Sequence, residues 1–193
     1  MKNSSPSRNT GLKTRRNLTA ENIVLTKWIG LCGSSIIARK REEELLQSFP
    51  SCFVETVRGF EDLLSTDIEK ELKAGYGTDY FSEVEGGGIY AALWEMAKSL
   101  GTGLDVFLKD IPVKQETIEI ANYFDVDPYY LLSGGACLFV TDRGYELTRA
   151  LNERGINAAV IGVITDSKDR VIINNGSRRF LSPRYTDPIS LFL

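Results

Sequence analysis

The chain has 193 residues, of which 42% are hydrophobic and 25% charged, with a formal net charge of −3 and no histidine. This composition suits one globular domain, and the acidic balance argues against a dedicated nucleic-acid binder. The absence of histidine excludes Ser–His–Asp and Cys–His nucleophile systems, because both require an imidazole. No apolar run reaches the roughly 18 residues of a membrane span, and no secretory signal is visible, so we expect a cytoplasmic protein without a membrane partner.

The first segment, residues 1–19, is polar and basic and contains no acidic residue. Such a composition predicts a disordered tail. A nucleic-acid-binding arm would also be basic, but this segment lacks the interleaved aromatic residues typical of one. The remaining residues, 20–193, show no internal repeat and no linker, and we interpret them as one domain.

In chain order, segments typical of strands alternate with segments that carry a helical apolar stripe. The first strand is expected over NIVLTKWIG (22–30), and Ser34 is in place to cap the helix that follows over 34–49. Further helices are expected over about 51–64, 67–73, 88–100, 114–124 and 144–155. Further strands are expected over 104–111, 136–141, 158–165, 170–174 and 178–181, the last two joined by a hairpin turn at Asn175-Gly176. This order predicts an α+β fold, a layered, mostly antiparallel or mixed sheet with helices on one or both faces.

A glycine-rich turn precedes one of these helices, in the stretch EVEGGG. The amides at a helix N-terminus favour an anion, so Gly86, Gly87 and Gly88 are candidates for phosphate binding, although glycines also serve tight turns and close packing. Glu83 and Glu85 beside them would repel a phosphate. They either point away or hold Mg²⁺, which prefers oxygen ligands.

A second glycine turn, Ser133-Gly134-Gly135, lies just before a buried strand. A tight turn is the simpler interpretation, but convergence with the first turn would create an anion site. Cys32 stands between two glycines where a strand gives way to a helix. It is either a small buried residue or a thiol activated by the helix N-terminus.

Three stretches together resemble a known family: IVLTKWIGLCGSSIIARKREEELL, the long segment that begins EVEGGGIYAALWEM and ends YYLLSGG, and AAVIGVITDSKDRVIINNGSRRFL. Their order is similar to the C-terminal domain of the aminoimidazole ribonucleotide (AIR) synthase superfamily, in its hydrogenase-maturation-factor-like branch. The resemblance spans about residues 20–182. It implies an α+β domain, with partial likeness to the ferredoxin-like arrangement, that closes over the phosphates of ATP with its glycine turns. The other half of such an enzyme carries most of the nucleotide-binding residues.

The chain departs from that family in two places. Only a short polar segment precedes the first family strand, so the N-terminal half is expected to be missing. The family turn usually has Asp or His, any residue, and Thr or Ser before its glycines, whereas this chain has Glu83, Val84 and Glu85. A carboxylate in place of a hydroxyl removes a neutral donor to phosphate and adds repulsion.

The resemblance therefore implies a domain that contributes phosphate-side residues to an ATP-dependent enzyme, with ATP and Mg²⁺ as cofactors. Its expected partner is a separate N-terminal-half chain or a second copy in a homo-oligomer. The alternative is a non-catalytic binding or interaction module, derived from that domain, that holds a small anion or a protein.

Overall fold

The computed structural model describes residues 18, 20–182 and 186–193. All but Leu18 of the tail expected over 1–19 therefore lies outside the described residues. Leu18 itself packs against the main hydrophobic core. Within the part of the chain that the structure describes, no helix is long and apolar enough to cross a membrane.

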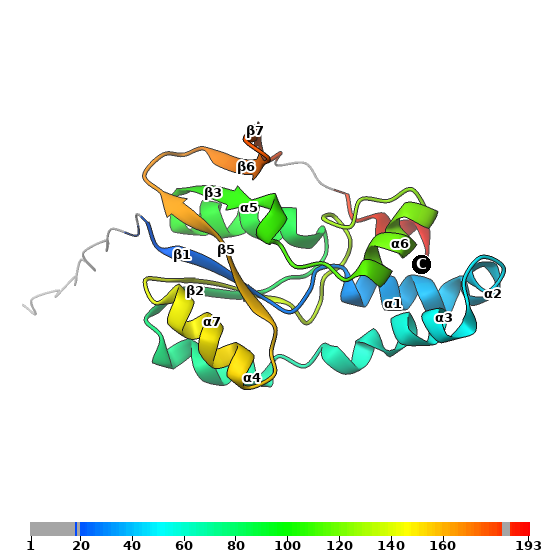
Figure 1. Ribbon diagram of the computed structural model, residues 1–193. Coiled ribbons are helices and arrows are strands. Elements are labelled where there is room, and N and C mark those ends of the chain that lie inside the picture. The colour runs from blue at the N-terminus through cyan, green and yellow to red at the C-terminus, as the bar shows by residue number, and fades with distance from the viewer. Residues whose placement is uncertain (1–17, 19, 183–185) are drawn as a thin grey trace, which may run out of the picture.

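A seven-stranded sheet with the order β2-β4-β1-β5-β3-β6-β7 runs through the domain (Figure 1). Neighbouring strands are antiparallel, apart from β3 and β6, which run parallel. The mixed sheet confirms the α+β prediction. The strands are β1 (Asn22–Thr26), β2 (Thr78–Glu83), β3 (Gly103–Phe107), β4 (Cys137–Thr141), β5 (Ala158–Thr165), β6 (Arg170–Asn174) and β7 (Ser177–Phe180).

Seven α-helices and four short 3-10 turns are arranged around this sheet in the described residues. The helices are α1 (Leu31–Lys40), α2 (Glu42–Leu45), α3 (Ser51–Arg58), α4 (Asp67–Leu72), α5 (Gly88–Leu100), α6 (Gln115–Tyr123) and α7 (Gly144–Glu153). The 3-10 turns are η1 (Gly59–Leu63), η2 (Lys73–Gly75), η3 (Leu108–Asp110) and η4 (Pro188–Leu191).

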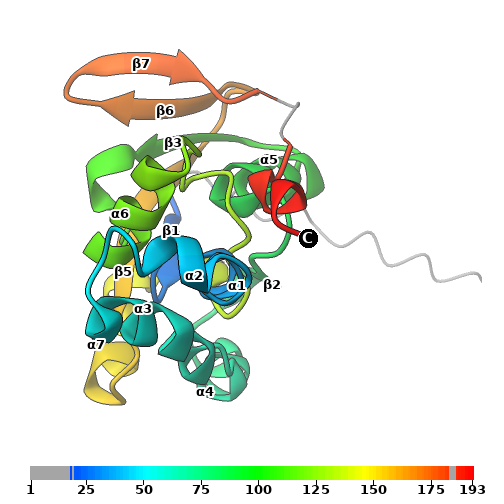
Figure 2. The ribbon, with the colours of Figure 1, turned by 90° about the vertical axis from the view of Figure 1, so that its right-hand side faces the viewer.

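The helices form three groups, each with its own apolar cluster. Helix α5 covers one face of the sheet, where Ile89, Leu93 and Met96 are fully buried against β1, β3, β4 and β5. Helix α7 covers the other face, where Leu147 and Leu151 join the cluster of that side. Helices α1, α3 and α6 pack together beyond one end of the sheet (Figures 1 and 2). The last residues of the chain fold back onto this third group.

Two local expectations are corrected by the structure. The first helix begins at Leu31, after Gly30, and Ser34 is buried inside it instead of capping it. Gly30 has a φ of 73°, a left-handed conformation that glycine adopts at little cost, so the chain turns into the helix one turn earlier. Strand β2, at the edge of the sheet, was not expected from the sequence. The Asn175-Gly176 hairpin is confirmed, with φ values of 47° and 83°.

Candidate functional site

The first glycine turn packs directly against the chain that precedes the second one. A Cβ on Gly88 would lie 2.4 Å from the carbonyl oxygen of Tyr129 and 2.9 Å from that of Leu131. Gly88 also has a φ of 64°. Both the conformation and the close approach of backbone require glycine here, so the structure gives Gly88 a packing role at the start of α5.

The second glycine turn packs against the start of α1. The amide of Gly30 donates to the hydroxyl of buried Ser133 over 2.8 Å, and the amide of Gly33 donates to the carbonyl of Leu132 over 2.9 Å. A Cβ on Gly134 would lie 3.6 Å from Sγ of Cys32. The segment from Tyr129 to Gly135 thus contacts the first turns of both α5 and α1. The chain that leads into the second glycine turn therefore lies against the first turn, while the second turn itself lies against the start of α1.

A carboxylate from the end of the chain lies at this convergence. Oδ2 of Asp187 accepts a hydrogen bond from the amide of Gly87 over 3.0 Å, and Oδ1 accepts one from the amide of Ile189 over 2.9 Å. Burial, and next the charge of Asp187, raise the pKa of the Cys32 thiol. The raised pKa favours the protonated thiol, so Cys32 behaves as a small, half-buried residue and not as an activated thiolate.

Only one amide of the first glycine turn is seen to bind a negative group. Gly87 donates to Asp187, whereas Gly86 is exposed and its amide has no described partner. Gly135, in the second turn, has a φ of 89°, and a Cβ there would lie 2.6 Å from Cα of Leu64. Like Gly88, Gly135 is required by packing. Among the candidate glycines, Gly87 has the clearest anion-binding geometry.

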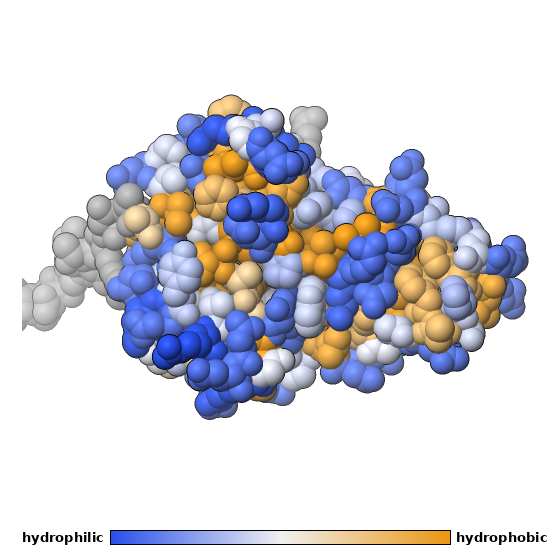
Figure 3. All heavy atoms as spheres, viewed as in Figure 1, coloured by the Kyte–Doolittle hydropathy of each residue, from blue (hydrophilic) through white to orange (hydrophobic). Residues whose placement is uncertain are grey.

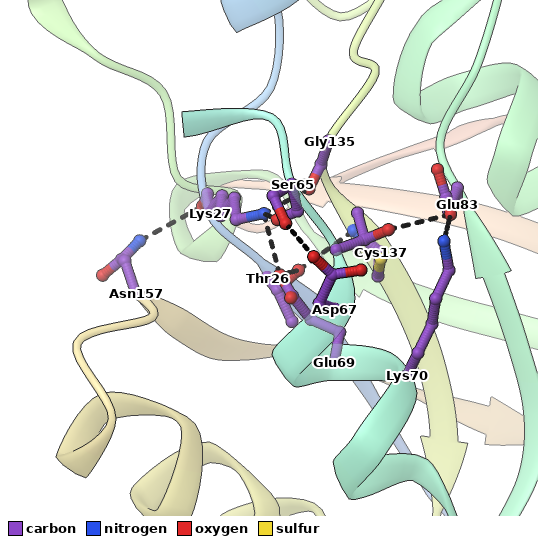
Figure 4. A network of polar contacts seen from close by, with 11 residues as sticks. Thr26, Lys27, Ser65, Asp67, Glu69, Lys70, Glu83, Gly135, Cys137 and Asn157 are labelled. Carbon is purple, nitrogen blue, oxygen red and sulfur yellow. Dashed lines mark hydrogen bonds and ion pairs between the residues drawn. The ribbon is translucent and has the colours of Figure 1, made fainter. Parts of the chain in front are cut away.

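The two candidate magnesium ligands lie in different surroundings. Oε1 of Glu83 lies 2.7 Å from Nζ of Lys70 and accepts a hydrogen bond from the hydroxyl of Thr66 over 2.9 Å (Figure 4). These contacts, the one from Lys70 first, lower the pKa of Glu83. Glu85 is exposed. The described residues contain no group of three or more acidic, cysteine or histidine side chains that could hold a metal.

An open groove of about 290 Å³ runs beside the first glycine turn, between β2 and α5. Three carboxylates, those of Glu83, Glu85 and Glu95, line it together with Tyr80 and Gly86. Glu83 is paired with Lys70 and Glu95 with Lys98, so Glu85 is the lining carboxylate without a described ion pair. The groove side of the turn therefore carries carboxylates, and the Gly87 amide already donates to another carboxylate, that of Asp187.

A buried ion pair supports the second glycine turn, and the sequence did not indicate it. Nζ of Lys27 lies 3.0 Å from Oε1 of Glu69 and donates to the carbonyl of Gly135 over 2.9 Å (Figure 4). It also donates to the carbonyl of Ser65. The hydroxyl of Thr26 donates to the same glutamate and accepts from the amide of Cys137. One lysine thus connects the end of β1, the start of α4 and the turn before β4. A lysine inside an otherwise apolar strand pattern is the only signal the sequence offers.

Fold and site together define an α+β domain in which the segment 129–135 contacts the N-terminal ends of both α5 and α1. A family model described as "AIR synthase related protein, C-terminal domain" matches residues 23–174. The chain belongs to this family, which confirms the resemblance seen in the sequence.

Solved structures with the same fold include two of the hydrogenase maturation protein HypE. The Escherichia coli HypE structure has a TM-score of 0.65 and 19% identity, with 91% of this chain and 53% of that chain covered. A HypE structure in complex with ATP has a TM-score of 0.67 and 17% identity, with 91% and 54% covered. Thiamine-monophosphate kinase from Stenotrophomonas maltophilia has a TM-score of 0.60 and 16% identity, with 84% and 52% covered.

This chain therefore spans about half the length of the solved structures that it resembles. At these identities the likeness concerns the fold. No curated protein sequence matches the chain.

Proposed function

We propose that this domain supplies phosphate-side residues to an ATP-dependent site that an N-terminal-half chain completes. The observation that carries the proposal is the Gly87 amide, which donates to a carboxylate where α5 begins. A helix N-terminus favours a negative group by about 0.3–1 kcal/mol. Further support comes from the chain leading into the second glycine turn, which packs against Gly88 there, and from a similar structure, HypE, solved in complex with ATP.

In this proposal Mg²⁺ binds together with the phosphates of ATP and does not require a metal site formed by the protein alone. Glu83 is already paired with Lys70, and Glu85 faces solvent at the acidic groove. Mg²⁺ commonly binds through one or two carboxylates together with substrate phosphates. Glu85 is the carboxylate free of a described ion pair, so it is the better candidate of the two to meet a magnesium ion bound to phosphate.

Calorimetric titration of the purified chain with ATP, with and without Mg²⁺, tests the proposal. We expect binding that requires Mg²⁺ and that weakens in Glu85→Gln. Glu95→Gln removes a negative charge from the same groove, further along α5 where Glu95 pairs with Lys98, and serves as the control. Absence of heat at millimolar ATP with Mg²⁺ would contradict nucleotide binding by this chain alone.

The second candidate function is a non-catalytic module that binds a protein partner or a second copy of the chain. Exposed aromatic side chains favour it: Phe180 is 73% and Phe107 36% exposed. Phe107 alternates with the buried β3 residues that face α5, so it lies on the opposite face of the sheet. Phe180 pairs with Val171, which in turn pairs with Asp105. Phe180 therefore lies on the same face as Phe107. Apolar surface is visible over β5 and β6 on the same side of the molecule (Figure 3). Such a patch is typical of an interaction site.

Light scattering of the wild-type chain and of Phe180→Ser distinguishes this second function. A homo-oligomer that becomes monomeric in the variant would support an interface on this face. A monomeric wild-type chain would exclude binding of a second copy, and the module would then have to bind a different protein. Tyr145→Ser, at a side chain 74% exposed on α7, is the control for a general effect on solubility.

A further inference from the structure

The last residues of the chain hold Asp187 in place at the glycine turn. Ile189 and Phe192 are 7% and 9% exposed and belong to the apolar cluster of α1, α3 and α6. The Phe192 ring packs edge-on against Phe124, with centroids 5.0 Å apart. The segment 187–193 is therefore docked by two apolar anchors, beside the N-terminal end of α5 (Figure 2).

Asp187 makes the hydrogen bond that a phosphate oxygen would make at the same amide. Both are negative oxygen acceptors, and the amide of Gly87 has one proton to donate. The carboxylate lies 3.0 Å from that amide through Oδ2, and Oδ2 is also the atom nearest to a Cβ built on Gly86, at 3.8 Å. After burial, the charge of Asp187 is the next cause of the raised pKa of the Cys32 thiol, at the first turn of α1. A second anion in this position would meet both steric overlap and repulsion.

We propose that the segment 187–193 is an autoinhibitory strap, in which Asp187 occupies the phosphate position and must leave before a phosphate binds. This inference rests on the proposed function. Two states follow from it: a closed state, with the carboxylate on Gly87, and an open state that is competent to bind. The apparent affinity for an anion is reduced by the fraction of molecules that are open.

Two measurements on the full chain test the strap, each with Asp187→Asn and Asp187→Ala. The first is calorimetric titration with ATP and Mg²⁺. We expect each variant to bind about five- to tenfold more tightly than the wild type, because the competing charge is gone. Glu55→Gln, at an exposed position on α3, removes one negative charge elsewhere and should leave the affinity unchanged.

The second measurement follows alkylation of Cys32 by iodoacetamide, read by mass spectrometry at each cysteine. Removal of the Asp187 charge and release of the strap both make the thiolate of Cys32 easier to form, so its alkylation should accelerate in both variants. Exposed Cys52 is the internal control and should react at the same rate in every form.

The outcomes separate the strap from the proposed function. Tighter ATP binding together with faster Cys32 alkylation supports the strap. Equal ATP binding by wild type and variants overturns the strap and leaves the proposed function standing. If no form binds ATP, nucleotide binding by this chain fails, and the strap as an inhibitor fails with it. Tighter ATP binding with unchanged Cys32 alkylation also overturns the strap, since Asp187 would then act from another position.

Discussion

Nζ of Lys27 lies 3.0 Å from Oε1 of Glu69 in the interior of the domain, with the two side chains 5% and 0% exposed. Oε2 of Glu69 has no hydrogen-bond partner among the described residues. Lys27 also has a φ of 58°, which is unusual for a residue with a side chain. The same lysine also donates to the Gly135 carbonyl, so it joins this buried pair to the second glycine turn.

Removing one member of this pair should be costly. Lys27→Met leaves the Glu69 carboxylate buried without its partner, and we expect the free energy of unfolding to fall by about 3–5 kcal/mol. The double variant Lys27→Met/Glu69→Leu removes both charges and should recover at least half of that loss. Urea denaturation of the three proteins measures both effects. A double variant as unstable as the single one would show that the hydrogen bond to Gly135, and not the unpaired charge, dominates.

The glycines of the first turn should differ sharply in their tolerance of a methyl group. Gly88→Ala places a Cβ against the backbone of Tyr129 and Leu131 at a positive φ, and we expect a loss of about 3 kcal/mol in the free energy of unfolding. Gly86→Ala is the matched control, because its Cβ would meet nothing closer than 3.8 Å. Its effect should remain within about 0.5 kcal/mol. Equal effects in thermal denaturation would refute the packing role of Gly88.

The ion pair between Glu83 and Lys70 predicts a pH dependence. Because the pKa of Glu83 is lowered from its ordinary value of 4.5, its ionised form stabilises the folded state above that value. This contribution is lost as the pH falls through the lowered pKa. Glu83→Gln should thus cost about 0.5 kcal/mol near neutral pH, a small effect because the pair is half-exposed, and nothing in strong acid.

Chemical denaturation at several pH values, compared between wild type and Glu83→Gln, measures this difference. Glu85→Gln is the control, and its stability should follow the wild type at every pH. A Glu83 effect that grew toward acidic pH would have the wrong sign for a carboxylate with a lowered pKa.

The three cysteines should react with iodoacetamide in a fixed order. Cys52 is exposed and should react first; Cys32 follows more slowly, because burial and the charge of Asp187 raise its pKa. Burial raises the pKa of Cys137 to about 12, and that residue should react only when the domain unfolds. A time course read by peptide mass spectrometry gives the order. Reaction of Cys32 as fast as Cys52 would contradict the burial of Cys32 and the nearby charge of Asp187.

Much of the fold could be predicted because periodic apolar residues are a local signal. The stripe of Ile89, Leu93 and Met96 predicted α5, and the apolar run 136–141 predicted β4, whose residues are all buried. Strand β2 was missed for a physical reason. It lies at the sheet edge with one neighbour, its residues are mostly half-buried, and its sequence TDYFSE carries no clean alternation.

The candidate site was predictable only in part. Glycine turns before a helix and before a strand are visible as local patterns, so Gly87 and Gly134 could be chosen from the sequence. Asp187 could not, because it reaches Gly87 from 100 positions further along the chain. The same holds for the pairing of Lys27 with Glu69. Contacts between residues so far apart depend on how the elements pack, and no local pattern encodes them.

The sequence by itself determined the α+β class, the order of most elements and membership of the family, since these follow from local periodicity and from motifs in order. The tertiary structure decided what the glycines do. It assigned Gly88 and Gly135 to close backbone packing, turned Glu83 toward Lys70 and brought Asp187 to Gly87. Those roles depend on distances between separate elements, which exist only once the sheet and its three helix groups have packed together.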